Sequence, residues 1–238
     1  MPLFWIILAF FLVFITATYV LFFWPKLQIV NIDISGNEKT ATEDIKNIVL
    51  ANINKNLISK SFFMVNIENI AKNILDGFPG IEDAKIRKKL PQAITLAIKE
   101  RKPFGVFCSD ACFLLDKNGI IFEQIPVIPP DMFVVRQEPV NNERRAGSPV
   151  FEEKIMNAIE KIQNNLKNNF QITIKKILVS DTIIVTTSEN WDIHFDITSD
   201  IDKQIMKMNT LLTSEIPPEA RKNLQYIYLQ YKDRAYYK

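Results

Sequence analysis

Residue types that carry chemistry are scarce in this sequence. Its 238 residues include one histidine, His194, and two cysteines, Cys108 and Cys112. A tetrahedral zinc site needs four ligands, and these three residues are too few and too far apart to supply them. Glycine-rich phosphate loops, the dinucleotide fingerprint and the His-Glu-x-x-His zinc motif are also missing. We therefore expect no metal, no cofactor and no catalytic residue, and the sequence favours a protein that is not an enzyme.

His194 lies in the stretch WDIHFD, where it alternates with Asp192 and Asp196 on a predicted strand. A histidine beside two carboxylates could act as a general base. The sequence has no Gly-x-Ser-x-Gly elbow and no reactive-cysteine context that would supply a nucleophile. We therefore interpret His194 as a structural residue.

An excess of charge of either sign is also lacking. Lysine and arginine number 29 against 27 aspartates and glutamates, which gives a net charge of +2. So small a net charge produces no strong field for nucleic acid, and we expect no nucleic-acid partner. The one dense basic run is Lys85-Ile-Arg-Lys-Lys89. Its alternation favours a solvated strand face over a patch for phosphate or lipid headgroups.

The stretch Leu3–Trp24 contains no charged residue over 22 positions. As a helix it would be about 33 Å long, which is enough to cross the hydrocarbon core of a bilayer. Trp5 and Trp24 lie near its two ends, where indole rings prefer the headgroup region. A cleaved signal peptide would have a basic start, a shorter apolar core and a small-residue cleavage site. The sequence instead predicts an uncleaved transmembrane anchor at residues 1–25.

The orientation of this anchor is weakly encoded. Lys26 and Lys39 follow the apolar stretch, which leans slightly toward a cytoplasmic position for the rest of the chain. Long domains cross the membrane largely regardless of such charges. Charge alone therefore leaves the topology open.

Cys108 and Cys112 flank the short sequence Ser-Asp-Ala between two apolar runs. A tight hairpin there would bring the two sulfur atoms opposite each other, within reach of a disulfide. A disulfide fits an oxidising compartment. Two reduced, half-buried thiols fit the same sequence nearly as well, and both interpretations stay open.

The first region after the anchor predicts a small α+β domain. A strand at 27–34 leads to a turn at Ser35-Gly36-Asn37, and Thr40-x-x-Glu43 matches a capping box for a helix that ends near Asn52. Asn66 is the predicted cap of a second helix, which Gly77 and Pro79-Gly80 end. Strands at 85–90 and 92–100 follow. The order is β-α-α-β-β, with the helices on one face of the sheet.

The second region predicts a mixed α/β domain with a largely antiparallel sheet. Ser148-Pro149 is the predicted start of a helix that ends near Asn168, and Ser199–Asp202 is the start of another. The segment 136–147 has the composition of a mobile loop. The predicted strands are 104–107, 112–115, 120–122, 171–179, 182–187, 191–197 and a last stretch at 224–237.

The C-terminal stretch Leu224–Lys238 has five tyrosines in fifteen residues and neither glycine nor proline. Tyrosine combines a large contact area with a polar tip, which suits protein interfaces. A strand of this kind at a sheet edge could accept a partner strand through its free backbone groups. The alternative is that the tyrosines only cover the domain's own sheet.

Two motifs resemble those of the FtsQ/DivIB family of cell-division proteins. They are I-x-I-S-G-N-x-x-T at Ile32–Thr40 and a long F-P-G-I…E-R-x-P pattern at Phe78–Pro103. The stretch LLDKNGIIF at Leu114–Phe122 is similar to the segment that follows in that family. The resemblance implies an anchor at 1–25, a POTRA domain at 26–102 and an FtsQ-type β domain at 103–238.

This resemblance also implies a function. The chain would be a non-catalytic scaffold in the cell membrane at the division septum, with both domains extracytoplasmic. Its partners would be small coiled-coil division proteins similar to FtsB/DivIC and FtsL, or other septal membrane proteins. Residues 226–231 (YIYLQY) match the family's partner-binding segment in outline and depart from it at Tyr228 and Gln230. The residues we expect to contact a partner are Tyr231, Asp233, Arg234 and Tyr236.

A POTRA-bearing adaptor for secretion or envelope assembly is the alternative interpretation. Tandem POTRA repeats or a following β-barrel would favour it, and neither is evident in the sequence.

Overall fold

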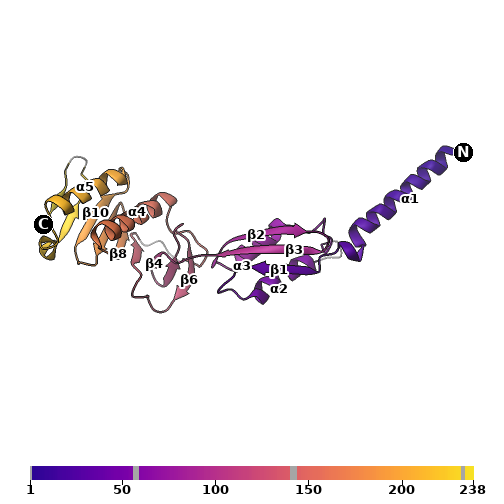
Figure 1. Cartoon of the computed structure of the whole chain (residues 1–238), viewed down its shortest axis with the longest axis horizontal. Coiled ribbons are helices and arrows are strands. Elements are labelled where there is room, and N and C mark those ends of the chain that lie inside the picture. Colours follow the sequence, from indigo (N-terminus) through magenta and orange to yellow (C-terminus); the bar gives the residue numbers. More distant parts are fainter. Residues whose placement is uncertain (1, 56–58, 140–143, 232–233) are drawn as a thin grey trace. The chain divides into compact units, whose positions relative to one another are not determined.

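A computed structural model describes residues 2–55, 59–139, 144–231 and 234–238 of the chain (Figure 1). By its internal contacts the chain divides into two compact units, Met1–Arg101 and Lys102–Lys238. Each unit has a hydrophobic core of its own, so each is described by itself.

The first element is the helix α1, Pro2–Phe23, which has no charged side chain. Large apolar side chains are exposed along its length, among them Leu3, Phe14 and Phe23. The hydroxyl groups of Thr16 and Thr18 donate to carbonyl oxygens of the preceding turn, so these polar groups are satisfied within the helix. Among the described residues, α1 is the one helix that is both long enough and apolar enough to cross a membrane.

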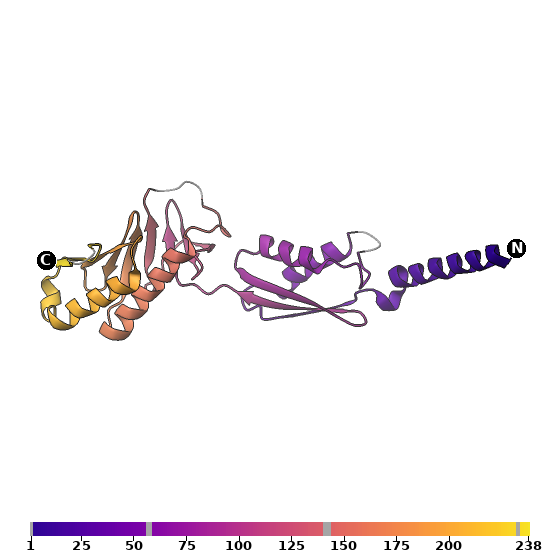
Figure 2. The ribbon, with the colours of Figure 1, turned by 90° about the horizontal axis from the view of Figure 1, so that it is seen from above.

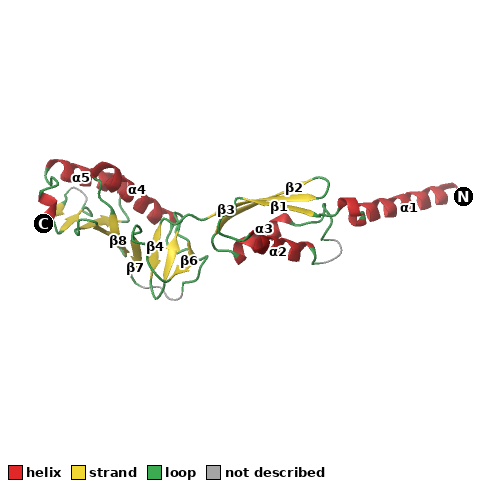
Figure 3. Cartoon of the chain, turned by 60° about the horizontal axis from the view of Figure 1, so that its bottom comes forward, coloured by secondary structure: helices red, strands yellow, loops and turns green. Residues whose placement is uncertain are grey.

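The rest of the first unit has the predicted order β-α-α-β-β. Three described strands form a sheet in the order β1-β3-β2, in which β1 is parallel to β3 and β2 is antiparallel to it. Figure 3 shows α2 and α3 together on one face of this sheet. The elements are η1 Pro25–Leu27 (a short 3-10 turn), β1 Asn31–Ser35, α2 Thr42–Ile53, α3 Ile67–Gly77, β2 Ile81–Lys89 and β3 Ala93–Glu100.

The spacing of apolar residues along the strands and helices explains why the helices pack on one face of the sheet. On β3 the alternate residues Ile94, Leu96 and Ile98 are buried, because a strand presents every second side chain to one face. Ile45 and Val49 of α2 lie four residues apart and face the same core. Asn66 caps α3 as predicted, since its side chain accepts from the backbone N–H of Asn69 at 2.9 Å.

The predicted capping box at Thr40 and Glu43 is wrong. Helix α2 begins at Thr42, and Ala41 occupies the cap position without a side-chain hydrogen bond. The backbone N–H of Thr40 instead donates to the carboxylate of Glu100 on β3 at 2.8 Å. The segment before α2 is therefore held by the sheet rather than by a local cap.

In the second unit, nine described strands form one sheet in the order β12-β11-β10-β9-β8-β7-β4-β5-β6. Most neighbouring pairs are antiparallel; β4–β7, β7–β8 and β10–β11 are parallel. The elements are β4 Gly105–Cys108, β5 Cys112–Leu115, β6 Ile121–Ile125, β7 Val134–Gln137, α4 Glu153–Phe170, β8 Ile174–Val179, β9 Thr182–Thr187, β10 Asp192–Asp196, α5 Ile201–Ser214, η2 Ala220–Asn223, β11 Tyr226–Tyr228 and β12 Tyr236–Tyr237.

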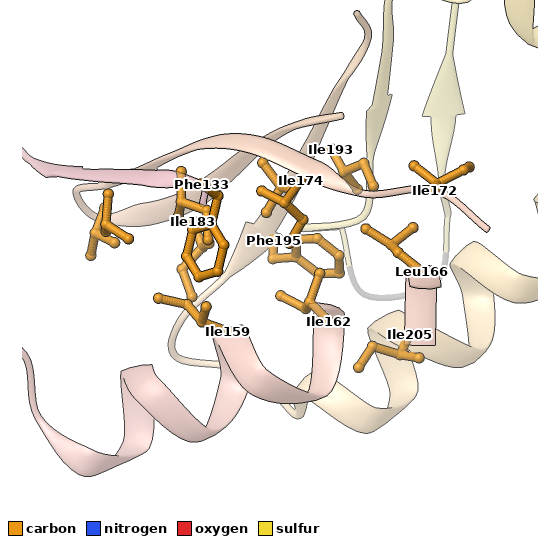
Figure 4. Packing of buried hydrophobic residues seen from close by; sticks show 14 of the residues in the cluster. Phe133, Ile159, Ile162, Leu166, Ile172, Ile174, Ile183, Ile193, Phe195 and Ile205 are labelled. Atoms are coloured by element: carbon orange, nitrogen blue, oxygen red, sulfur yellow. The ribbon is translucent and has the colours of Figure 1, made fainter. Parts of the chain in front are cut away.

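Figure 2 shows α4 and α5 on the same side of this sheet. Their apolar faces pack on alternate residues of the strands, as the labelled side chains of Figure 4 show. Phe195 and Ile193 of β10 are fully buried there against Ile162 of α4 and Ile205 of α5. The opposite face of β9, β10 and β11 carries half-buried polar and aromatic side chains.

Strand β7 was not predicted from the sequence, and α4 begins later than predicted. Strand β7 has only four residues and follows a proline-rich stretch, so its period was too short to identify. Helix α4 begins at Glu153 rather than at Ser148-Pro149. Pro149 instead forms a β-bridge with Ile120, and Val150 donates to the carbonyl of Gly119 at 2.8 Å. The chain thus runs along the sheet before the helix can begin. Part of the predicted mobile loop 136–147 lies outside the described residues.

Candidate functional site: the C-terminal edge of the large sheet

The tyrosine-rich C-terminus forms two strands rather than the single last strand that the sequence predicts. Strand β11 is parallel to β10, and β12 folds back antiparallel to β11. Tyr226–Tyr228 are therefore inside the sheet, and the edge strand is Tyr236–Tyr237. The sequence signal for a return turn is weak, because the segment between the strands contains neither glycine nor proline.

The backbone of β12 determines which groups face outward. Lys238 and Tyr226 exchange two backbone hydrogen bonds, from Lys238 N to Tyr226 O at 3.2 Å and from Tyr226 N to Lys238 O at 3.4 Å. In an antiparallel pair the next residue along a strand points its N–H and C=O the other way. Both backbone groups of Tyr237 therefore point away from β11. They form a short open edge that an added strand could use.

Three of the four residues expected to contact a partner can be placed. Tyr231 and Tyr236 are about half exposed, and their rings meet edge to face with centroids 5.3 Å apart. Arg234 is exposed, and Asp233 lies outside the described residues. The edge strand thus brings Tyr231 and Tyr236 together across the turn.

Tyr237, which the sequence did not single out, lies next to Tyr236 on the opposite face of the edge strand. Its side chain is about half exposed, and its hydroxyl group donates to the Glu215 carboxylate at 3.1 Å. This hydrogen bond and the negative charge of Glu215 raise the pKa of Tyr237 above its ordinary value. The sequence did contain a signal for Tyr237. Successive residues of a strand point to opposite faces, so Tyr237 lies on the face that Tyr236 does not.

A shallow groove of about 420 Å³ lies beside the edge, between α5 and the C-terminal segment. It is lined by Lys203, Met206, Lys207, Thr210, Leu211 and Ala235. The Lys207 ammonium donates to the carbonyl oxygens of Leu229 at 2.9 Å and Tyr231 at 2.6 Å, which fixes the segment after β11 on α5. The exposed side chain of Met206 lines this groove together with Ala235, the residue before β12.

The other face of the same strands carries an aromatic row. The rings of His194 and Tyr228 lie 4.3 Å apart, and those of Tyr228 and Tyr226 lie 4.6 Å apart. Burial lowers the pKa of His194, and the negative charge of Asp192 partly opposes this. The Thr186 hydroxyl donates to Asp192 at 2.7 Å. His194 therefore packs on aromatic rings beside a carboxylate that already has a partner, and we retain the structural interpretation.

Comparison with known proteins finds a matching domain model and similar cell-division proteins. A family model described as "POTRA domain, FtsQ-type" matches residues 27–101. The chain is 27% identical over 196 residues to "Cell division protein DivIB" of Clostridium tetani, covering 79% of this chain and 71% of that protein. The chain is thus similar to the DivIB cell-division proteins, and residues 27–101 match an FtsQ-type POTRA domain.

Other DivIB relatives match shorter parts. The DivIB of Clostridium botulinum (strain Hall) is 30% identical over 152 residues, which covers 61% of this chain and 56% of the relative. The DivIB of Clostridium acetobutylicum is 30% identical over 100 residues, covering 42% and 38%. These alignments span about half or less of those relatives.

Two further features of the chain bear on chemistry. Cys108 and Cys112 face each other across the β4–β5 hairpin and are joined by a disulfide, with their Cα atoms 4.2 Å apart. Among the residues that the structure describes, no cluster of His, Cys, Asp or Glu side chains could hold a metal ion.

Proposed function

We propose that this chain is a non-catalytic membrane scaffold of the cell-division machinery. Residues 1–25 would anchor it in the cell membrane at the division septum, and 26–102 and 103–238 would bind other division proteins outside the cytoplasm. Support comes from the candidate membrane span, the FtsQ-type POTRA match and the DivIB relatives. The disulfide between Cys108 and Cys112 is consistent with an oxidising, extracytoplasmic compartment.

The partner we propose is a small coiled-coil division protein similar to FtsB/DivIC or FtsL. It would add a strand to β12, and its neighbouring side chains would contact Tyr231, Asp233, Arg234 and Tyr236. The observation that carries this proposal is the outward orientation of the Tyr237 N–H and C=O at the end of the sheet. The groove beside α5 supplies apolar surface next to these groups.

Replacing Tyr237 by proline tests the added strand directly. Proline removes the outward N–H and leaves the Tyr236 and Lys238 bonds to β11 in place, a position where edge strands tolerate proline. Tyr237→Ala is the matched control, because it removes the same side chain and keeps the N–H. With the full chain in nanodiscs and the FtsB/DivIC-like protein of the same cell, we expect Tyr237→Pro to lose binding at least tenfold relative to Tyr237→Ala. Equal affinities would exclude strand addition at β12.

A second experiment tests the topology. Asn118 is exposed in the hairpin turn after β5, so Asn118→Cys gives a reactive thiol on the surface of the second unit. A maleimide that cannot cross the membrane should label this variant in intact cells. The parent chain, with its two cysteines joined, should stay unlabelled. Labelling only after lysis would place the domain in the cytoplasm and remove the septal role.

A further inference from the structure

The end of the POTRA domain next to the anchor is built from three chain segments. They are 24–30, which follows α1; 59–65, which precedes α3; and 88–92, the turn between β2 and β3. Backbone hydrogen bonds join them: Phe62 N donates to Leu27 O at 2.8 Å, Ile29 N to Lys60 O at 2.9 Å, and Val30 N to Gln92 O at 2.9 Å. We call the exposed side chains of these three segments the basal surface.

The basal surface exposes large apolar side chains. Leu90 is 67% exposed, Val30 68%, Phe63 51% and Met64 50%. Within the POTRA domain these residues could have been buried against the core, as their neighbours Phe62, Val65 and Ile29 are. A cluster of exposed apolar side chains in a small domain marks a contact surface.

The charges of the basal surface have one sign. Its segments contain Lys26, Lys60, Lys88 and Lys89 and no aspartate or glutamate. The Lys88 ammonium donates to the carbonyl of Phe63 at 3.3 Å and lies 5.8 Å from the centre of the Phe62 ring. This contact holds the end of β2 beside the 59–65 segment, so the lysines and the apolar side chains share one surface. Apolar side chains mixed with lysines suit the interface of an anionic membrane.

The chain geometry keeps this surface close to the membrane. Helix α1 ends at Phe23, and four further residues lead to Leu27, a span of at most about 14 Å when fully extended. The backbone of Phe62 is hydrogen-bonded to Leu27. The headgroup layer on each side of a bilayer is about 5–8 Å thick. The basal surface therefore stays within reach of the headgroups whichever way α1 leaves the domain.

We propose that the basal surface docks on the anionic lipid bilayer that α1 crosses. Val30, Phe63, Met64 and Leu90 enter the boundary between headgroups and acyl chains, while the lysines contact lipid phosphates. The POTRA domain is then held against the membrane surface and does not reorient freely about the short segment that follows α1. This inference requires α1 to span the membrane, and it does not depend on the proposed edge at β12.

The test measures the depth of single nitroxide labels on the full chain in nanodiscs. Met64→Cys and Leu90→Cys carry the label on the basal surface. Asp76→Cys is the matched control, because it is exposed nine residues into α3, about 14 Å further along that helix than Ile67. In discs with phosphatidylglycerol we expect the first two labels at the headgroup level, protected from a water-soluble nickel relaxant and accessible to oxygen. The Asp76 label should stay in water.

A second experiment tests the contribution of the lipid charge. Lys60 and Lys89 are exposed, so Lys60→Gln with Lys89→Gln should lower the ratio of docked to free domain about fivefold per lysine in anionic discs. Discs of phosphatidylcholine alone should show the weaker docking with or without these changes. Labels at 64 and 90 that stay accessible to nickel in both lipids would overturn the proposal. Protection that occurs only in native membranes and not in pure lipid would assign the surface to a protein and overturn it as well.

Discussion

The two sheets of this chain differ most at their edges. Both are covered by two helices on one face. The edge strand β2 of the POTRA domain exposes Lys85, Arg87 and Lys89, and lysines and arginines on an edge discourage another strand from pairing. The edge strand β12 of the second unit is only two residues long and consists of tyrosines.

This difference indicates where strand addition can occur. A short edge strand of two tyrosines, beside a groove that includes Met206 and Leu211, is suited to an added strand, whereas a long edge strand with three exposed basic residues is protected against one. The lysine-rich end of the POTRA domain is instead suited to a surface with negative charge. The family resemblance alone does not say which sheet edge is basic and which is not. The strand order and the residues of the two edge strands do.

The largest expected effects test whether the two units are separate folds. Phe195 is fully buried between the large sheet and its helices, and Ile94 is fully buried under α2 and α3. Phe195→Ala should lower the free energy of unfolding of the second unit by about 3–5 kcal/mol, and Ile94→Ala that of the first by about 2–5 kcal/mol. Urea unfolding followed by hydrogen exchange should show each loss in one unit only. A loss shared by both units would show that they unfold together.

The glycine turns of the two units give a second, smaller pair of effects. Gly36 has φ +85° and Gly119 has φ +80°, and an added Cβ would lie 2.2 Å from Ile98 O or 2.6 Å from Phe151 O. Replacing either by alanine should cost its own unit about 2 kcal/mol or more. Gly80→Ala is the control, because nothing lies within 4 Å of its added Cβ. Thermal unfolding of the three variants should leave Gly80→Ala close to the parent.

Much of the fold follows from local patterns in the sequence. The alternation of Ile94, Leu96 and Ile98 and the cap at Asn66 are sufficient to predict the POTRA order. The cap of α2 could not be predicted, because Glu100 replaces it from sixty residues away. The position of the open edge could not be predicted either. The chain reverses between β11 and β12 without a glycine or proline, so the sequence does not show that β12 is the outermost strand. Features that depend on neighbouring residues can thus be predicted from the sequence, whereas strand order and contacts between distant residues cannot.

Glu100 gives the POTRA domain a stability that depends on pH in the acid range. Burial alone would raise its pKa, but the N–H groups of Thr40 and Lys39 donate to the carboxylate and hold the pKa below the ordinary value of 4.5. The stability it contributes is thus present above pH 4.5 and is lost as the pH falls through the lower folded value. Glu100→Gln should cost the domain about 1 kcal/mol at pH 7, because these bonds are partly exposed. The cost should shrink in acid, and an equal cost at pH 7 and pH 3 would contradict this role.

The smallest expected effect concerns His194 in the second unit. Burial beside Tyr228 lowers its pKa below the ordinary value of 6.5, against the charge of Asp192. The unfolded chain therefore binds a proton at a higher pH than the folded chain does, and the second unit loses stability as the pH falls from 6.5 through the folded pKa. His194→Gln keeps a polar side chain that does not titrate, so its stability should change less over the same range. Urea midpoints of parent and variant between pH 7.5 and 5 measure the difference, and parallel curves would mean that another group titrates there.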